Sequence, residues 1–268
     1  MELNNSILNK ENYSVIVDNS LNINLSLKDI SSEVSFVVLD NQELNLNIHD
    51  FNTDNQLTFY VNKFSKVNVK IINDNLDKKI AIKGDVKDSG EINFYFADFS
   101  SNNLDLVSNV ILEGENSKGS FRFSSVANDK ITKKYNVGFD QIGHKSSSEF
   151  IGYGVSLKTG EIDAKGITHI EKNVVKAVAD QKIKVILFDK ESKAKASPTL
   201  RIDSDDIIAN HACAIGSLNE DHIFYLKTRG LDESEARRLI TMGYLIPLEE
   251  YFDKDDKDKI DSYIKENF

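Results

Sequence analysis

The sequence predicts a mainly β protein, a parallel β-solenoid followed by a small helical module, and three observations support this. Apolar and polar residues alternate over most of residues 13–126, as they do in strands that bury one face. The alternating segments recur at a nearly fixed spacing, and a helical period replaces the alternation only after Gly216. A chain of 268 residues has room for one large domain or two small ones.

The first strands form two interleaved sets. One set starts at positions 21, 44, 67 and 92, so its spacing is nearly constant. The other lies between them, at 34–39, 57–61, 80–82 and 104–112. Two strands per unit, recurring within the roughly 20–50-residue range of repeat folds, favour coils that stack on one another. An antiparallel sandwich of hairpins is the alternative, but Asn-Gly and Asp-Gly, which favour tight hairpins, do not occur.

Strand character continues from 137 to 210 and is interrupted once. The segment EKNVVKAVADQ, residues 171–181, is interpreted as either a short helix or a polar excursion between coils. We therefore expect a β-helix core over residues 1–216, with a short lead-in over 1–12, and a helical module over 217–268.

The helical module is predicted from its start and stop signals. Asn219 can cap a helix that runs to about Arg229, and Gly230 can end it. Asp232 and Glu235 have the spacing of a capping box at the start of a second helix. The expected buried faces of the second and a final helix consist of Ala236, Leu239, Ile240 and Gly243, and of Ile260, Tyr263, Ile264 and Phe268.

Composition excludes several classes of protein. The formal net charge is −10 and the pI about 5.1, the wrong sign for non-specific binding to nucleic acid or to an anionic membrane. No run approaches the roughly 18 apolar residues of a membrane helix, and the first twenty residues do not resemble a secretion signal. A single cysteine fits a reducing compartment, so we expect a cytoplasmic protein without membrane insertion.

Short catalytic and nucleotide-binding motifs are absent from the sequence. There is no Walker A loop, dinucleotide fingerprint, H-E-x-x-H, G-x-S-x-G or C-x-x-C. His211 and Cys213 are the one constellation of interest: in an extended segment they project from the same face and offer two ligands for iron or another transition metal. Alternatively, Cys213 is a small buried hydrophobe and His211 a hydrogen-bonded edge residue.

The acidic segment RIDSDDI has two interpretations. Asp203, Asp205 and Asp206 resemble the carboxylate clusters that bind hard cations, whereas a solvated turn is the simpler explanation.

The segment 197–240, SPTLRIDSDDIIANHACAIGSLNEDHIFYLKTRGLDESEARRLI, resembles the signature of the SufB/SufD family of iron–sulfur cluster assembly proteins. The glutamate that follows the histidine in SufB-type members is absent, so the chain is more similar to SufD-type members. The family's small residues after the histidine are replaced by Ala212 and Cys213. The positions that match the family pattern are Pro198, Leu200, Ile202, Asp205, Asp206, His211, Gly216, Phe224, Tyr225, Leu226, Arg229, Gly230, Glu235, Ala236 and Arg237.

The resemblance implies a right-handed parallel β-helix and a non-catalytic subunit that pairs with a SufB-like protein. It also implies that a SufC-like ATPase docks on residues 219–246, with Phe224, Tyr225, Arg229, Gly230, Glu235 and Arg237 as candidate contacts. His211, with Cys213, would handle iron or a nascent cluster at the subunit interface, so that no cofactor is stably bound. Two alternatives are a homodimeric β-helical scaffold without a metal role and a β-helical carbohydrate-binding or carbohydrate-active protein.

Overall fold

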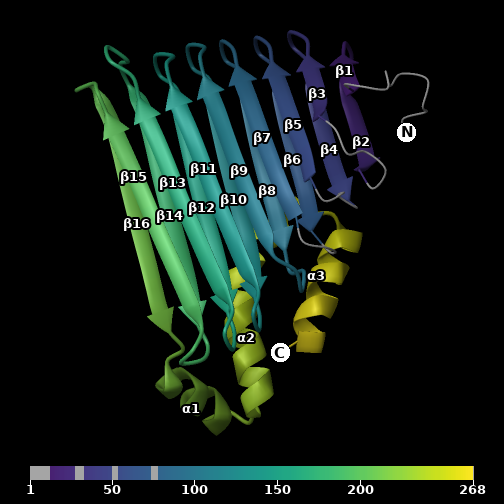
Figure 1. Cartoon of the computed structure of the whole chain (residues 1–268), viewed down its shortest axis with the longest axis vertical. Coiled ribbons are helices and arrows are strands. Elements are labelled where there is room, and N and C mark those ends of the chain that lie inside the picture. The colour runs from purple at the N-terminus through teal and green to yellow at the C-terminus, as the bar shows by residue number, and fades with distance from the viewer. Residues whose placement is uncertain (1–12, 28–32, 50–53, 74–77, 268) are drawn as a thin grey trace.

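The computed structural model describes residues 13–27, 33–49, 54–73 and 78–267, so the predicted lead-in over residues 1–12 lies outside the described residues. Within the described residues, strands make up most of the chain as far as Ser217, and helices follow (Figure 1). The strands are β1 Tyr13–Val17, β2 Leu21–Ser26, β3 Glu33–Val38, β4 Glu43–His49, β5 Asp54–Val61, β6 Lys66–Asn73, β7 Lys78–Val86, β8 Glu91–Asp98, β9 Leu104–Leu112, β10 Lys118–Ala127, β11 Thr132–Gln141, β12 Ser147–Ser156, β13 Glu161–Ile170, β14 Ala177–Leu187, β15 Lys193–Ile202 and β16 Ile207–Ser217. The helices are α1 Glu220–Thr228, α2 Glu233–Leu245, the 3-10 helix η1 Ile246–Tyr251 and α3 Lys254–Asn267.

The strands form two parallel sheets of eight strands each. Odd-numbered strands follow one another in one sheet, and even-numbered strands do so in the other. Parallel neighbours need a crossover connection, and here each crossover contains a strand of the opposite sheet. The parallel β-solenoid is thus confirmed. The antiparallel sandwich is wrong, because every strand pair in the described part of the chain is parallel.

The register reproduces the spacing seen in the sequence and then widens. Leu44 lies beside Leu21 in the even sheet, as the predicted spacing requires. Farther along the same sheet Ile207 lies beside Ala177, which is a wider offset along the chain. Strand length rises in step, from 5 residues in β1 to 11 in β16. The coils therefore become longer from the N-terminal to the C-terminal end of the solenoid.

Aromatic rings fill much of the space between the sheets. In the even sheet, Phe94, Phe121 and Phe150 occupy consecutive positions across β8, β10 and β12. Their ring centroids are 5.8 and 6.2 Å apart, distances at which each aromatic pair stabilises the fold by about 0.5–1.5 kcal/mol beyond its buried area. The next two positions of this inward-facing column are Gln181 on β14 and His211 on β16. The column thus changes from aromatic to polar in the last two coils.

The helices cover the outer face of the even sheet over its middle strands. The ring of Tyr251 in η1 stacks on Tyr95 of β8 at 4.2 Å between centroids. The hydroxyl of Ser124 on β10 donates a hydrogen bond of 3.2 Å to the carbonyl of Leu245 in α2. A second apolar core lies between this face and the helices, and among its buried members are Ala97, Val126, Val155, Leu245, Leu248 and Ile260.

A buried ion pair lies beneath this helical cover. Lys133 Nζ is 2.8 Å from Asp98 Oδ1 and 2.7 Å from Ser100 Oγ, and the Lys133 and Asp98 side chains are both fully buried. Tyr263 of α3 packs on Phe99, with ring centroids 5.5 Å apart. Burial, with a smaller contribution from the Asp98 carboxylate, raises the pKa of Tyr263 to about 12. The helical cover is therefore coupled to a polar cluster inside the protein.

Two expectations about local structure are wrong in part. Of the two interpretations of residues 171–181, the helix is wrong: residues 171–176 connect two coils without a helix, and β14 begins at Ala177 and alternates buried and exposed positions. In α2, Leu239 is 48% exposed and Gly243 is exposed as well. Of the predicted face, Ala236 is buried and Ile240 packs against the second apolar core. The helix also buries Thr241 and Leu245, because its orientation is set by the sheet on which it packs rather than by its own apolar pattern.

Candidate interface and docking site

His211 and Cys213 lie on β16, the last strand of the even sheet. Their register partners on β14 are Gln181 and Ile183, each about 1% exposed and directed between the sheets. Because alternate residues of a strand share a face, His211 and Cys213 are directed to this inner side as well. In the described chain no further strand pairs with β16, so both side chains lie at the open end of the solenoid.

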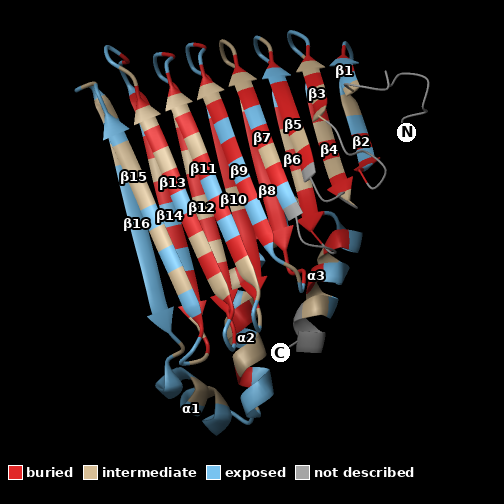
Figure 2. Ribbon diagram, in the orientation of Figure 1, coloured by how far each residue is buried: buried red, intermediate tan, exposed pale blue. Residues whose placement is uncertain are grey.

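The open end exposes residues that would be interior in any earlier coil. His211 and Cys213 are both exposed, and Ile215, which faces the same way, is 41% exposed. Figure 2 shows β16 exposed along almost its whole length, whereas strands in the middle of the solenoid, such as β8 and β10, are mostly buried. The interpretation of Cys213 as a buried hydrophobe is therefore wrong. Its strand has the alternation of a core strand but no coil to cover it.

Two donors do not complete a metal site. The Cys213 sulfur is 4.0 Å from the Ala196 carbonyl oxygen on β15, a weak contact that leaves the thiol accessible. No group of three or more His, Cys, Asp or Glu side chains within the described ranges is arranged to hold a metal ion. A transition metal at His211 and Cys213 would thus need further ligands from another molecule.

Helix α1 follows the last strand after only two residues, Leu218 and Asn219. The Asn219 side chain accepts a hydrogen bond of 2.8 Å from the Asp221 amide, which is the predicted cap. The helix stops at Gly230, whose φ of +97° is a conformation that glycine adopts without strain. α1 buries none of its residues, and its Phe224 and Tyr225 are 70% and 55% exposed. Large apolar side chains exposed in this way are typical of a surface that binds a partner.

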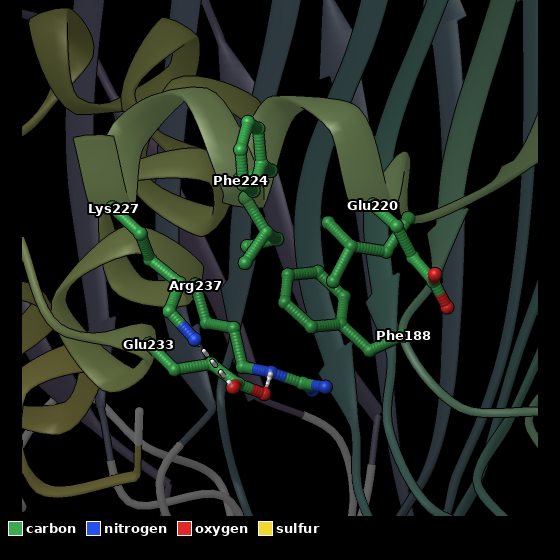
Figure 3. Close-up of a pocket in the computed structure, with 8 residues that line it drawn as sticks. Phe188, Glu220, Phe224, Lys227, Glu233 and Arg237 are labelled. Carbon is green, nitrogen blue, oxygen red and sulfur yellow. Dashed lines mark hydrogen bonds and ion pairs between the residues drawn. The ribbon is translucent and has the colours of Figure 1, made fainter. Parts of the chain in front are cut away.

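A pocket of about 320 Å³ separates α1 from the start of α2 and the end of β14. Figure 3 shows Phe224 and Phe188 on its apolar side and a charged group of Lys227, Glu233 and Arg237 on the other. Glu233 contacts both cations, at 3.4 Å from Lys227 Nζ and 3.5 Å from Arg237 Nε. The pocket therefore combines an apolar wall with an ion-paired rim.

The candidate docking residues differ in how far other residues of the chain hold their side chains. The Arg229 guanidinium lies 5.3 Å from the centroid of the Tyr225 ring and 3.1 Å from the Tyr225 hydroxyl. Glu235 completes the capping box with Asp232, as predicted. Arg237 is held inside the module, 5.7 Å from the Phe188 ring centroid and 4.0 Å from Asp189 Oδ1. Phe224 and Tyr225 are thus the freest of the set, while Glu235 and Arg237 also stabilise the helices.

Sequence reasoning missed Phe188, Lys227 and Glu233 as pocket residues. Phe188 directly follows β14, where the strand alternation ends, and nothing in its neighbourhood indicates that α2, far along the chain, returns to it. Lys227 and Glu233 read as ordinary surface charges of two short helices. Only the packing of α1 against α2 brings them to one rim.

In the acidic segment after β15, Asp203 belongs to a cluster of carboxylates around His169. Asp203 Oδ2 is 2.8 Å from His169 Nε2, and Glu171 and Asp140 carboxylate oxygens lie 3.6 and 3.9 Å from His169 Nδ1. Among these described residues, no group of three or more His, Cys, Asp or Glu side chains is arranged to hold a metal ion.

In the part of the chain described here, no helix is long and apolar enough to cross a membrane.

The fold and the site define a class of protein, namely parallel β-solenoids whose last coil is open and is followed by a helical module. The family model of the SufBD core domain of the SUF iron–sulfur cluster assembly system matches residues 28–244. The chain belongs to this SufBD family.

Curated relatives agree with this assignment over half of the chain. The iron–sulfur cluster assembly protein SufD of Bacillus subtilis is 29% identical over 137 residues, 51% of this chain and 31% of the relative. An iron–sulfur cluster assembly SufBD family protein of Staphylococcus epidermidis is 26% identical over 139 residues, 52% of this chain and 30% of the relative. The matched segments thus span about a third of these relatives.

Proposed function

We propose that the chain is a SufD-like, non-catalytic subunit of an iron–sulfur cluster assembly complex. It pairs with a SufB-like subunit through its last coil, and it receives a SufC-like ATPase on α1 and α2. The observation that carries the proposal is the open last coil, on which His211 and Cys213 are exposed and accessible to a second molecule. Membership of the SufBD family supports it.

Pairing at the last coil has a simple physical basis. The outer edges of β15 and β16 present unpaired backbone donors and acceptors, as edge strands do, and can accept another strand. Ile208 and Ile215 add exposed apolar surface, since their side chains are 61% and 41% exposed. A partner that covers this end would bury both isoleucines and supply the ligands that the chain lacks. Iron or a nascent cluster would then be held only transiently, between the two subunits, by His211 and Cys213 with the partner's donors.

ATPase docking is assigned to the exposed aromatic pair of α1 and the adjoining pocket. Phe224 and Tyr225 can pack into an apolar depression of the ATPase, while the pocket beside Phe188 admits one of its side chains. Aromatic anchors of this kind carry a large share of the binding free energy at interfaces. The chain itself is proposed to bind no ATP.

The test co-expresses the chain with the SufB-like and SufC-like proteins of its organism and measures complex formation by size-exclusion chromatography with light scattering. Ile215→Lys is expected to weaken pairing at least about tenfold, and Phe224→Ala to weaken ATPase docking by a similar factor. Ile16→Lys and Phe64→Ala are the matched controls, since Ile16 and Phe64 are 63% and 64% exposed but lie far from β16 and α1. Unaltered association in both test variants would overturn the assignment.

A second copy of the chain is the alternative occupant of the open end, as in a homodimeric scaffold without a metal role. The same open edges of β15 and β16 support it. It predicts a dimer of the isolated chain that Ile215→Lys dissociates, together with unchanged cluster assembly in cells that carry Cys213→Ser and His211→Ala.

A further inference from the structure

Two buried glutamines on the inner side of the solenoid differ in how their carboxamides are bonded. Gln141, fully buried at the end of β11, donates to Ser146 Oγ at 3.1 Å and to the Val178 carbonyl at 3.2 Å, and it accepts from Ser148 Oγ at 3.1 Å. Both ends of its carboxamide are therefore hydrogen-bonded. Such completeness is normal for a buried polar group, because an unpaired buried acceptor costs about 1–3 kcal/mol.

Gln181, on β14, is bonded at one end only. Its Nε2 donates to Thr168 Oγ1 at 2.9 Å and to the Thr199 carbonyl at 3.2 Å. Its Oε1 is buried and has no hydrogen-bond partner among the described residues, although the whole side chain is only 1% exposed. The contact of Nε2 with the Thr199 carbonyl fixes the orientation of the amide, because a flipped amide would set two acceptors against each other. The unpaired atom of the carboxamide is therefore the oxygen, which accepts hydrogen bonds.

The last coil provides the group that can use this acceptor. His211, on β16, is the register partner of Gln181 and follows it in the same inward-facing column. Neighbouring strands of a sheet lie about 4.8 Å apart. The other inward-facing side chains of the last coil are apolar or, for Cys213, weak donors. They are Ala194, Ala196, Pro198, Leu200 and Ile202 on β15 and Ile207, Ala209, Cys213 and Ile215 on β16. His211 alone among them carries a nitrogen donor.

We propose that Gln181 is the positioning residue of His211: Gln181 Oε1 accepts a hydrogen bond from one imidazole N–H when the exposed ring turns onto it. This bond selects one neutral tautomer and leaves the lone pair of the other ring nitrogen directed to the open end. Histidines that bind metals are commonly oriented by such a bond from their second nitrogen. A role of this hydrogen bond in iron or cluster handling rests on the proposed function. The tautomer preference of His211 is a property of the chain alone.

The test measures the tautomer of His211 by long-range proton–nitrogen NMR correlation on the full chain, at a pH at which the ring is neutral. Gln181→Met removes the acceptor at similar volume, and Gln141→Met is the matched control, a buried inner glutamine outside the His211 column. A hydrogen bond of ordinary strength corresponds to an about two- to tenfold change in the tautomer ratio. We expect that change in Gln181→Met and none in Gln141→Met.

Several outcomes decide the matter. An identical tautomer ratio in Gln181→Met and the native chain, with both folded by circular dichroism, would overturn the proposal and leave a buried water as the partner of Oε1. A shift in Gln141→Met equal to that in Gln181→Met would overturn it too, because the effect would then be one of general stability.

A second arm separates this inference from the proposed function. The chain co-purified with its SufB-like partner is reconstituted anaerobically with ferrous iron and sulfide, and bound iron is measured. Loss of iron in His211→Ala together with an about 10- to 100-fold weaker retention in Gln181→Met supports both ideas. Unchanged iron in His211→Ala contradicts the proposed function, while the tautomer measurement still decides the role of Gln181.

Discussion

The middle coils and the last coil are built from the same alternating strands but have opposite surroundings. β8, β10 and β12 pack against neighbouring coils on both sides, and the helices cover their outer face, so nearly all of β8 and β10 is buried. β16 has the same alternation but buries no residue fully. The difference teaches that in a solenoid the strand pattern says which side chains face inward, whereas the presence of the next coil decides whether they are buried.

The largest expected effect is the difference in free energy of unfolding between a substitution in the aromatic interior and one in the last coil. Phe121→Ala removes a fully buried ring that contacts Phe94 and Phe150, and should lower the free energy of unfolding by about 3–5 kcal/mol. Ile208→Ala removes a side chain that is 61% exposed and should change it by less than about 0.5 kcal/mol. Urea unfolding followed by circular dichroism measures both. Similar values would mean that the last coil is covered in the isolated chain.

The next effect contrasts two lysine–carboxylate pairs. Lys133→Met leaves the buried Asp98 carboxylate without its cation, so the free energy of unfolding should fall by about 3 kcal/mol. Adding Asp98→Leu should recover much of this loss. Lys195 on β15 pairs with Glu161 at 2.6 Å but is 65% exposed. Lys195→Met should leave the urea midpoint unchanged. A double variant no more stable than Lys133→Met would contradict the account of the buried pair.

The smallest expected effect is a loss of stability at alkaline pH that originates in the helical cover. The pKa of Tyr263 is raised from 10.0 to about 12 by burial, so folding favours the neutral phenol. Its contribution is complete below pH 10 and is lost as the pH rises to 12, a change of about 2–3 kcal/mol. Thermal unfolding at pH 9 and 11 should show a smaller drop in Tm for Tyr263→Phe than for the native chain. An equal drop would show that α3 does not bury this phenol.

Much of the fold was predictable because it depends on local patterns. The spacing of the first strands follows from alternating residues such as Leu21 and Leu44, which lie side by side as expected. The caps at Asn219 and Asp232 depend on two or three neighbouring residues and were predicted as well. Signals of this kind need no knowledge of distant parts of the chain.

The rest depends on contacts between residues far apart. Lys133 and Asp98 are 35 residues apart, and no local pattern indicates that a lysine in a strand will be fully buried. Cys213 has the sequence context of a core residue, yet its exposure follows from the missing next coil. Arg237 matches a family position that suggested docking, but Phe188 and Glu233 engage it inside the module. The sequence thus predicted the strand and the helices that carry the candidate residues, but not the surroundings of their side chains.

The lengthening of the coils gives the molecule a wedge shape along its axis. One coil carries the chain from Leu21 to Leu44 near the narrow end, whereas the longer coil at the wide end carries it from Ala177 to Ile207. The two ends therefore differ in cross-section. In an end-to-end assembly that continues the sheets, the strands that meet at the junction must have similar lengths. Only another wide end has strands as long as β16. Geometry thus dictates the orientation of such an assembly before any side chain is compared.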